Sequence, residues 1–194
     1  MAEFAEKAVL STTPDAVELL TAEFKSFITK SPFLFIVSGT KQTGVDISPR
    51  GDAPGFVKTG RNNKLFLPDR VGNNRVDTLC NILTDPSIAL IFLVPGRPEM
   101  LTVSGKARIL INEQLLSLLA SNGKPPKSAI ELTATAATMQ HSIAIEYSDF
   151  WRPKKNDQLA QLASFGEILA DQVGGMTKEE ATEFVDESYE QRLY

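Results

Sequence analysis

Apolar and polar residues follow two periods along this chain, one typical of strands and one typical of helices. The clearest strand covers 101–111, where apolar or small residues alternate with Thr, Ser, Lys and Arg. Nearly continuous apolar runs at 33–38 and 88–94 predict buried strands, because a strand covered on both faces needs no polar side. The remaining predicted strands are shorter and lie at 45–47, 64–67 and 130–136. Together these segments predict a sheet of about six strands.

Helical spacing predicts elements between the strands and at both ends of the chain. The first helix is expected over about 13–30, where Thr13 can cap its first turn. The last is a helical tail over about 156–194, in which Thr177 and Glu180 form a capping box. Shorter helices are expected at two inner places, over 76–83 and from Asn112 to about residue 120.

These elements predict one α+β domain over residues 1–194, with a mainly β core that forms a small barrel and with peripheral helices. A linker rich enough to divide two domains is missing from the sequence. The net charge of −4, without a block of Lys or Arg, argues against nucleic-acid binding. No apolar run approaches the roughly 18 residues that read as a membrane span, and the first residues lack a signal-peptide core. We therefore expect a cytoplasmic protein.

Two loops rich in Pro, Gly, Asp, Asn and Arg each follow a strand, and they are the first candidates for ligand binding. In the first loop Arg50 lies between Pro49, which fixes the backbone, and Gly51, which allows a ligand to approach closely. Its guanidinium suits a phosphate or a planar carbonyl edge. It also suits an ion pair with Asp52 across the turn, and this loop alone does not separate the two interpretations.

The second loop, PDRVGNNR, leads directly into the predicted helix at 76–83. The unpaired N–H groups of a helix N-terminus, with Asn and Arg side chains beside them, make an anion site. Asn73 or Asn74 has a simpler interpretation as the N-cap, and Arg75 as a solvated residue. A cation in the first turn opposes the helix dipole, however, and a bound anion explains its presence. We therefore predict a phosphate site here.

Other candidate residues are less specific. His141 is the only histidine and Cys80 the only cysteine, so we expect neither a metal site nor a disulfide. The simpler interpretation of His141 is a polar residue at a strand–helix junction, and that of Cys80 is a small apolar residue on a helix. Strongly specific motifs of hydrolases, kinases and Rossmann dinucleotide-binding sites are absent from the sequence. Phe150 and Trp151 either close the core or line a ring-shaped ligand.

Several strings in the sequence are similar to those of a known family. They are DISPRGDAPGF, LPDRVGNNRVDTLCNIL, DPSIALIFLVPG, LTVSGKARI, GKPPKSAIEL, GEILADQV and the closing Leu193-Tyr194, together with His141 and Trp151-Arg152-Pro153. Over nearly the whole chain they resemble the pyridoxamine 5'-phosphate oxidase-like superfamily, and within it a subgroup of FMN-dependent proteins.

The resemblance implies an FMN-binding split β-barrel, usually a homodimer with two flavins at the subunit interface. It implies an FMN-dependent oxidoreductase acting on a small molecule that the sequence does not identify. It also implies roles for particular residues: Asn73, Asn74 and Arg75 hold the phosphate, Leu67, Pro68 and Asp69 run beside the ring and ribityl chain, Ser48 and Arg50 follow on the neighbouring strand, and His141 and Trp151 come from the other subunit.

One segment departs from the family pattern. Where related proteins carry a run like HCxKAxxRSxLW, this chain has HSIAIEYSDFW, which is one residue shorter and acidic through Glu146 and Asp149. The departure keeps two alternatives open, a flavin- or haem-binding module without turnover and a deazaflavin-dependent reductase. Oxidation of pyridoxamine phosphate itself is not expected, because the basic substrate-binding segment near the C-terminus has no counterpart.

Overall fold

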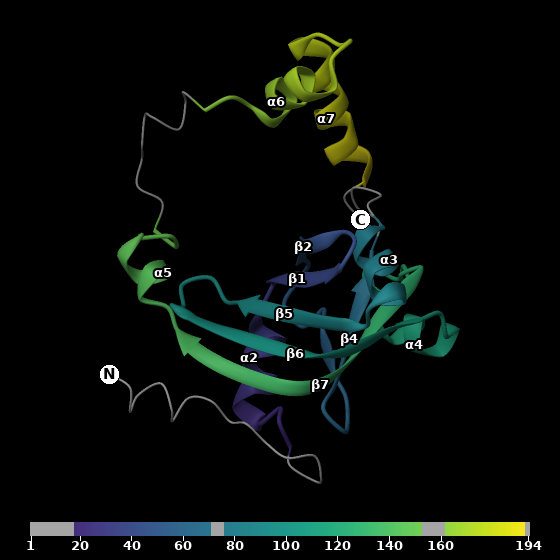
Figure 1. The fold of residues 1–194 in the computed structure, drawn as a ribbon, viewed down its shortest axis with the longest axis vertical. Coiled ribbons are helices and arrows are strands. Elements are labelled where there is room, and N and C mark those ends of the chain that lie inside the picture. Colours follow the sequence, from purple (N-terminus) through teal and green to yellow (C-terminus); the bar gives the residue numbers. More distant parts are fainter. Residues whose placement is uncertain (1–17, 71–75, 153–161, 193–194) are drawn as a thin grey trace. The chain divides into compact units, whose positions relative to one another are not determined.

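The computed structural model describes residues 18–70, 76–152 and 162–192 (Figure 1). By its internal contacts the chain separates into two compact units, Met1–Arg152 and Pro153–Tyr194. The prediction of one domain over residues 1–194 stays a prediction, since the compactness of each unit does not fix their mutual packing. Among the described helices, none is both long and apolar enough to cross a membrane.

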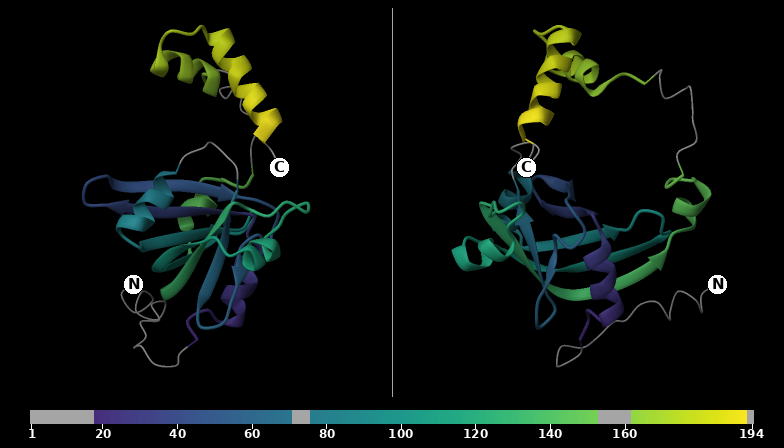
Figure 2. Two further views of the ribbon diagram at one scale, coloured as in Figure 1. Left: turned by 90° about the vertical axis from the view of Figure 1, so that its right-hand side faces the viewer. Right: turned by 180° about the vertical axis from the view of Figure 1, so that it is seen from behind.

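The first unit is built on one curved, seven-stranded antiparallel sheet (Figures 1 and 2), with the strand order β2-β1-β5-β6-β7-β4-β3. The strands are β1 (Phe33–Thr40), β2 (Gly44–Gly51), β3 (Lys58–Thr59), β4 (Lys64–Asp69), β5 (Ser87–Leu93), β6 (Glu99–Leu110) and β7 (Ser128–His141). The helices are α2 (Ala22–Lys30), α3 (Asp77–Thr84), α4 (Glu113–Leu118) and α5 (Ile143–Tyr147). The predicted α+β fold with a mainly β core is confirmed. The added strand, β3, has only two residues and gives no pattern of its own.

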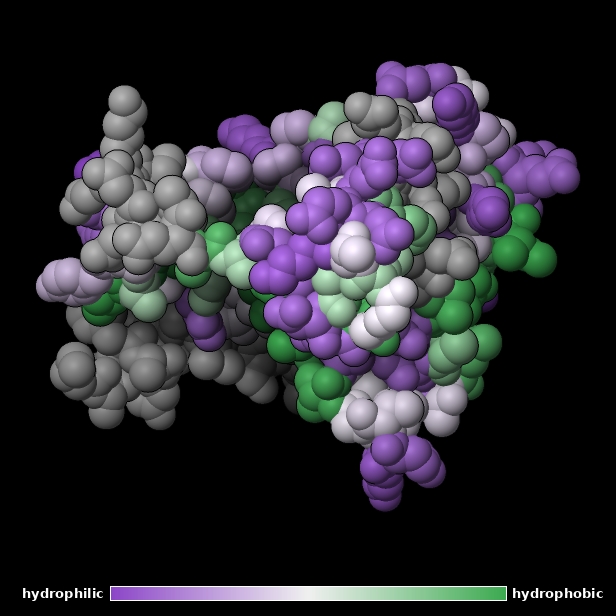
Figure 3. All heavy atoms as spheres, turned by 90° about the horizontal axis from the view of Figure 1, so that it is seen from above, coloured by the Kyte–Doolittle hydropathy of each residue, from purple (hydrophilic) through white to green (hydrophobic). Residues whose placement is uncertain are grey.

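The core lies on one face of the central strands. Alternate residues of β1, β5 and β6 are fully buried there, and they form one cluster that α2 extends through Ile28: Leu34, Ile36, Leu90, Phe92, Leu101 and Val103. The alternation predicted for 101–111 therefore corresponds to a real division between an inner and an outer face. Other large apolar side chains reach the surface and appear as green patches among hydrophilic residues in Figure 3.

The first helix begins later than predicted. Within the described residues it starts at Ala22, and Thr21 is its N-cap, with the Thr21 hydroxyl accepting from the N–H of Phe24. The preceding residue, Leu20, is fully buried and donates its N–H to the side-chain oxygen of Asn63 at 3.2 Å. That long-range bond uses the backbone of Leu20, and the chain bends at residues 19 and 20 before the helix begins. The predicted cap, Thr13, lies outside the described residues.

The second unit consists of α6 (Phe165–Val173) and α7 (Lys178–Arg192), which cross closely. A Cβ added to Gly166 would lie 2.6 Å from the Cα of Thr182, so only glycine allows this approach. The predicted capping box of Thr177 and Glu180 is confirmed by reciprocal hydrogen bonds of 2.8 and 3.2 Å. A second box at Ser164 caps α6, so the predicted tail helix is wrong over residues 162–164, and its earlier part lies outside the described residues.

Candidate functional site

Strand β2 carries its polar side chains toward the core and its apolar side chains toward the surface. Ser48 lies opposite Ile36 of β1, and Arg50 lies opposite Leu34. Residues directly opposite in an antiparallel pair share a face, so both polar side chains are on the buried face of β1. On the other face of β2, Ile47 is 60% exposed. A half-buried Arg on a core face needs a polar partner, which makes this strand a candidate for ligand binding.

An ion pair joins the two loops that the sequence singled out. Asp52, just after β2, accepts from the guanidinium of Arg70, just after β4, and both side chains are nearly buried, at 11% and 12% exposed. Arg70 also donates to the carbonyl of Leu119 at 3.1 Å. Because β2 and β4 are not neighbours in the sheet order, this contact closes the sheet on itself. The two candidate loops therefore meet in space.

The same ion pair decides one of the open interpretations. Asp52 pairs with Arg70, and Arg50 forms no hydrogen bond or ion pair with any residue in the described part of the chain. The Arg50–Asp52 pair considered from the sequence is therefore not formed. Within the described residues, none accepts a hydrogen bond from the guanidinium of Arg50, which has five donors.

The strand end of β4 contributes mainly backbone and one carboxylate. Leu67 and Pro68 are buried in register with β7, and Leu67 is part of the core. Asp69 is half-buried and accepts from the hydroxyl of Ser128 at 3.1 Å. A ligand at this end meets Asp69 first, because the side chain of Leu67 is already covered.

The predicted phosphate ligands Asn73, Asn74 and Arg75 lie outside the described residues, so the phosphate site stays a prediction. The helix that follows is described, and its N-cap position is held by Val76, without a side-chain hydrogen bond. The alternative in which Asn73 or Asn74 is the N-cap is therefore wrong.

His141 lies in a cluster of carboxylates at the junction between β7 and α5. Its Nε2 is 3.1 Å from a carboxylate oxygen of Glu146, and its Nδ1 is 3.9 Å from one of Glu99. A hydrogen bond from Arg97 holds the pKa of Glu99 below its usual value, and His141 adds to this effect. Trp151 joins the cluster through its indole N–H, which donates to the carbonyl of Arg97 at 2.8 Å. The strand–helix junction predicted for His141 is thus observed.

The two clusters lie at opposite ends of one strand. Ser128, which contacts Asp69, is the first residue of the 14-residue strand β7, and His141 is the last. At about 3.3 Å per residue they are roughly 40 Å apart along the strand. Arg97 and Glu99 share the far end with His141. One chain therefore does not bring Asp69 and His141 to the same small ligand.

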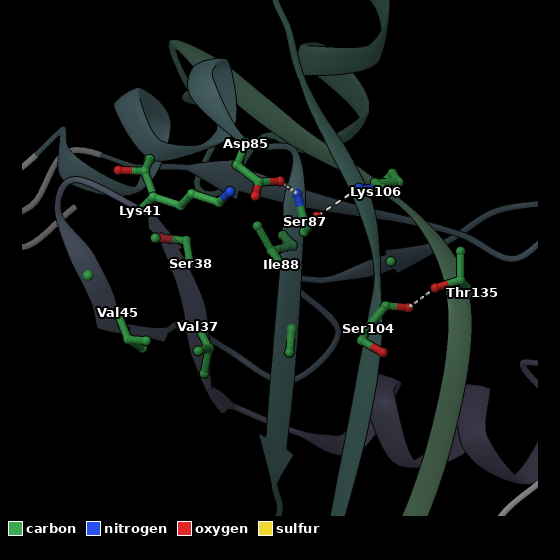
Figure 4. Close-up of a pocket in the computed structure, with 15 residues that line it drawn as sticks. Val37, Ser38, Lys41, Val45, Asp85, Ser87, Ile88, Ser104, Lys106 and Thr135 are labelled. Atoms are coloured by element: carbon green, nitrogen blue, oxygen red, sulfur yellow. Dashed lines mark hydrogen bonds between the residues drawn. The ribbon is translucent and has the colours of Figure 1, made fainter.

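A separate cavity of about 750 Å³ lies over the outer face of the sheet (Figure 4), and none of the predicted site residues lines it. Its walls come from the β1–β2 hairpin and from β5, β6 and β7, and they include Lys41, Val45, Asp85, Ser104 and Lys106. Sequence reasoning missed this cavity because its residues come from five strands and carry no local motif.

The fold and the paired loops define a split-barrel protein of the type that the sequence suggested. A family profile described as Pyridoxamine 5'-phosphate oxidase matches residues 20–141, and the chain belongs to that family. No curated protein matches the chain.

Several solved structures are similar to this chain at low sequence identity. HupZ of Group A Streptococcus is 14% identical, with a TM-score of 0.51 over 63% of this chain and 94% of that chain. A protein from Clostridium acetobutylicum related to general stress protein 26, of the pyridoxinephosphate oxidase family, is 14% identical over 64% and 91%, with a TM-score of 0.47. The FAD binding protein from Mycobacterium smegmatis is 14% identical over 64% and 97%, with a TM-score of 0.44.

Proposed function

We propose that this protein is a cytoplasmic flavoprotein that binds FMN and acts as an FMN-dependent oxidoreductase on a small molecule. The observation that carries the proposal is the contact of Asp52 with Arg70. It brings the two candidate loops together and leaves Arg50 half-buried on the core face with no ion pair to a described residue. Membership of the family supports the choice of a flavin.

The residues present fit the chemistry of FMN, which is a phosphate dianion attached to a flat, largely apolar ring. Arg50 offers charged donors suited to the phosphate or to the pyrimidine edge of the ring. Asn73, Asn74 and Arg75 supply the phosphate ligands in this proposal. The strand end at Pro68 and Asp69 provides a wall with one polar group. FMN would supply the redox chemistry, and the chain would supply binding, orientation and a field that tunes it.

The proposal includes a homodimer, because His141 and Trp151 lie too far from Asp69 to reach the same flavin within one chain. A second copy related by twofold symmetry presents its own β7 end to the first, which completes two equal sites.

Flavin binding is tested on the purified chain by its visible absorbance and by titration of the apoprotein with FMN. Arg50→Ala and Arg75→Ala are each expected to weaken FMN binding by about tenfold or more, since a charged hydrogen bond contributes about 1.5–3 kcal/mol. Arg61→Ala is the matched control, because Arg61 is exposed in the turn between β3 and β4. No binding at saturating FMN, or wild-type affinity in both variants, contradicts the proposal.

A second candidate function is a flavin- or haem-binding module without turnover. The acidic segment after His141 favours it, because this chain has Glu146 and Asp149 in the segment where the family pattern has basic residues. Tight FMN binding without reduction by NADH or NADPH, and without oxidase activity, supports this candidate. Competition between FMN and a deazaflavin distinguishes a deazaflavin-dependent reductase, and a haem titration distinguishes the haem-binding case.

A further inference from the structure

The cavity on the outer face of the sheet has a positively charged rim. Two lysines and one aspartate line it, and they come from different parts of the chain: Lys41 from the β1–β2 turn, Asp85 from the end of α3 and Lys106 from β6. In Figure 4 the side chain of Lys41 extends across the top of the cavity toward Asp85, and Lys106 lies beyond Ser87. Charges gathered from three elements point to a ligand of the opposite sign.

Lys41 is carried by a turn that is held in place. The hydroxyls of Thr40 and Thr43 lie 2.9 Å apart and bond across the turn, and Thr43 also donates to Asn81 of α3 at 3.3 Å. Asn81 in turn donates to the buried hydroxyl of Ser38 at 3.1 Å. Lys41 itself forms no hydrogen bond or ion pair with a residue that the structure describes. A fixed turn therefore presents an ammonium group that has no partner within the described parts of the chain.

The other side of the rim is also fixed by hydrogen bonds. Lys106 donates to the hydroxyl of Ser87 at 2.7 Å, and the N–H of Ser87 donates to Asp85 at 2.9 Å. The hydrogen bonds from Ser87 hold the pKa of Asp85 below its usual value, so its carboxylate stays charged. One carboxylate against two ammonium groups leaves the rim with an excess of one positive charge.

The floor of the cavity combines apolar side chains with polar groups at an irregularity between β6 and β7. Val37 of β1 and Ala89 of β5, which pair directly, form its apolar part together with Val45 of β2. The register of β6 and β7 shifts between Ser104 and Gly105, and the hydroxyl of Thr135 donates to the carbonyl of Ser104 at 3.3 Å. Bulges of this kind turn side chains out of the regular pleat and recur beside binding sites.

We propose that this cavity binds a small anion with an apolar body, such as a carboxylate or phosphate carried on a ring. It is a wide depression of about 750 Å³ that is largely open to solvent, so it contacts one side of such a ligand. The lysines bind the anionic group and the floor covers the apolar part. The proposal does not rest on flavin binding, because the cavity shares no residue with the predicted flavin site.

The test uses a pair of probes that differ in charge alone. The full chain, with and without saturating FMN, is titrated calorimetrically with 2-naphthoate and with the uncharged 2-naphthamide. We expect one naphthoate per chain, weaker binding of the amide, and equal naphthoate affinity in both samples. Lys41→Gln and Lys106→Gln are each expected to weaken naphthoate binding by about two- to fivefold, as for exposed ion pairs, and to leave amide binding unchanged.

Lys58→Gln, on the exposed surface of β3, is the matched control. When 2-naphthoate is added to the wild-type protein, the backbone N–H chemical shifts of Val45, Ser87 and Ser104 are expected to change. Several results would overturn the proposal: naphthoate that does not saturate, amide binding as tight as naphthoate binding, competition by FMN, or lysine variants that match the control. A chain that fails to bind FMN but binds naphthoate as described rejects the proposed function and keeps this site.

Discussion

Strands β1 and β2 form one hairpin, yet they place opposite kinds of side chain on the same face. Leu34 and Ile36 of β1 are fully buried, whereas the residues opposite them on β2 are Arg50 and Ser48. Burial of leucine and isoleucine stabilises the fold, while a half-buried arginine that has no ion pair to a described residue does not. The comparison indicates that β1 contributes packing, whereas β2 carries the side chains that the proposed function assigns to a ligand. The two strands therefore respond differently to mutation.

The largest expected effect is on β1. Leu34→Ala removes a side chain that is 0% exposed, and we expect it to lower the free energy of unfolding by about 2–5 kcal/mol. Urea denaturation followed by circular dichroism measures the change. FMN affinity of the folded fraction should stay near the wild-type value, and a well-folded Leu34→Ala protein that has lost FMN would erase the distinction between the strands.

The next effect is on the contact that closes the sheet. Arg70→Gln leaves the nearly buried carboxylate of Asp52 without its charged partner, so we expect a loss of about 2–3 kcal/mol in unfolding free energy. FMN affinity should fall as well, because the loops separate. The double variant with Asp52→Asn should recover part of the stability, and an additive loss in the double variant would show that the two residues act independently.

Arg50 gives the sharpest contrast with its neighbour Leu34. Arg50→Leu removes a charge that is half-buried and adds apolar surface, so we expect the unfolding free energy to change by less than about 0.5 kcal/mol. FMN affinity is expected to fall by about tenfold. Denaturation and flavin titration of the same sample separate the two quantities. A large loss of stability would mean that Arg50 supports the fold and not a ligand.

Glu131 is a buried charge that the fold itself explains, and it serves as the reference for Arg50. It is 5% exposed and pairs with Arg108 at 2.8 Å and with Lys64 at 3.2 Å. Its hydrogen bond from Arg108, followed by that from Lys64, lowers the pKa of Glu131 below the ordinary value of 4.5. Its contribution to stability is therefore present above pH 4.5 and is lost as the pH falls through the lowered pKa.

Glu131→Gln should reduce the decrease in unfolding free energy at acid pH, and this effect is the smallest of those proposed here. Urea denaturation at neutral pH and at several pH values below 4.5 measures it. Glu113→Gln, on the exposed first turn of α4, is the control. If the unfolding free energy of Glu131→Gln fell with acid pH as steeply as that of the wild type, the ion pairs would not couple folding to protonation.

The spacing of apolar residues and the helix-capping residues predicted the strands and most helices. These signals failed where polar residues continue a strand. Strand β2 reaches Gly51 through Ser48, Pro49 and Arg50, which look like a loop in the sequence. An edge strand tolerates Pro49, because its missing N–H faces no neighbour. Strand β7 likewise continues to His141 through polar residues. Local pattern cannot predict pairing that is provided by a distant strand.

For the site, the sequence identified which residue types suit an anion but not their partners. The pairing of Asp52 with Arg70 depends on closure of the sheet, which no short-range pattern encodes. The separation of His141 from Asp69 depends on the length of β7, which the sequence underestimated. The cavity near Lys41 and Lys106 depends on five strands and the turn between two of them, so only the assembled sheet reveals it.

The fluorescence of Trp151 depends on how far a bound flavin lies from its indole. It is the only tryptophan, and its indole is held at the carbonyl of Arg97 beside His141. A flavin at the Asp69 end of the same chain would be roughly 40 Å away along β7 and would accept little excitation energy from the indole. A flavin bound across two chains would lie beside a neighbour's indole and quench its emission strongly. The intensity of ultraviolet fluorescence thus reports which chain completes the site.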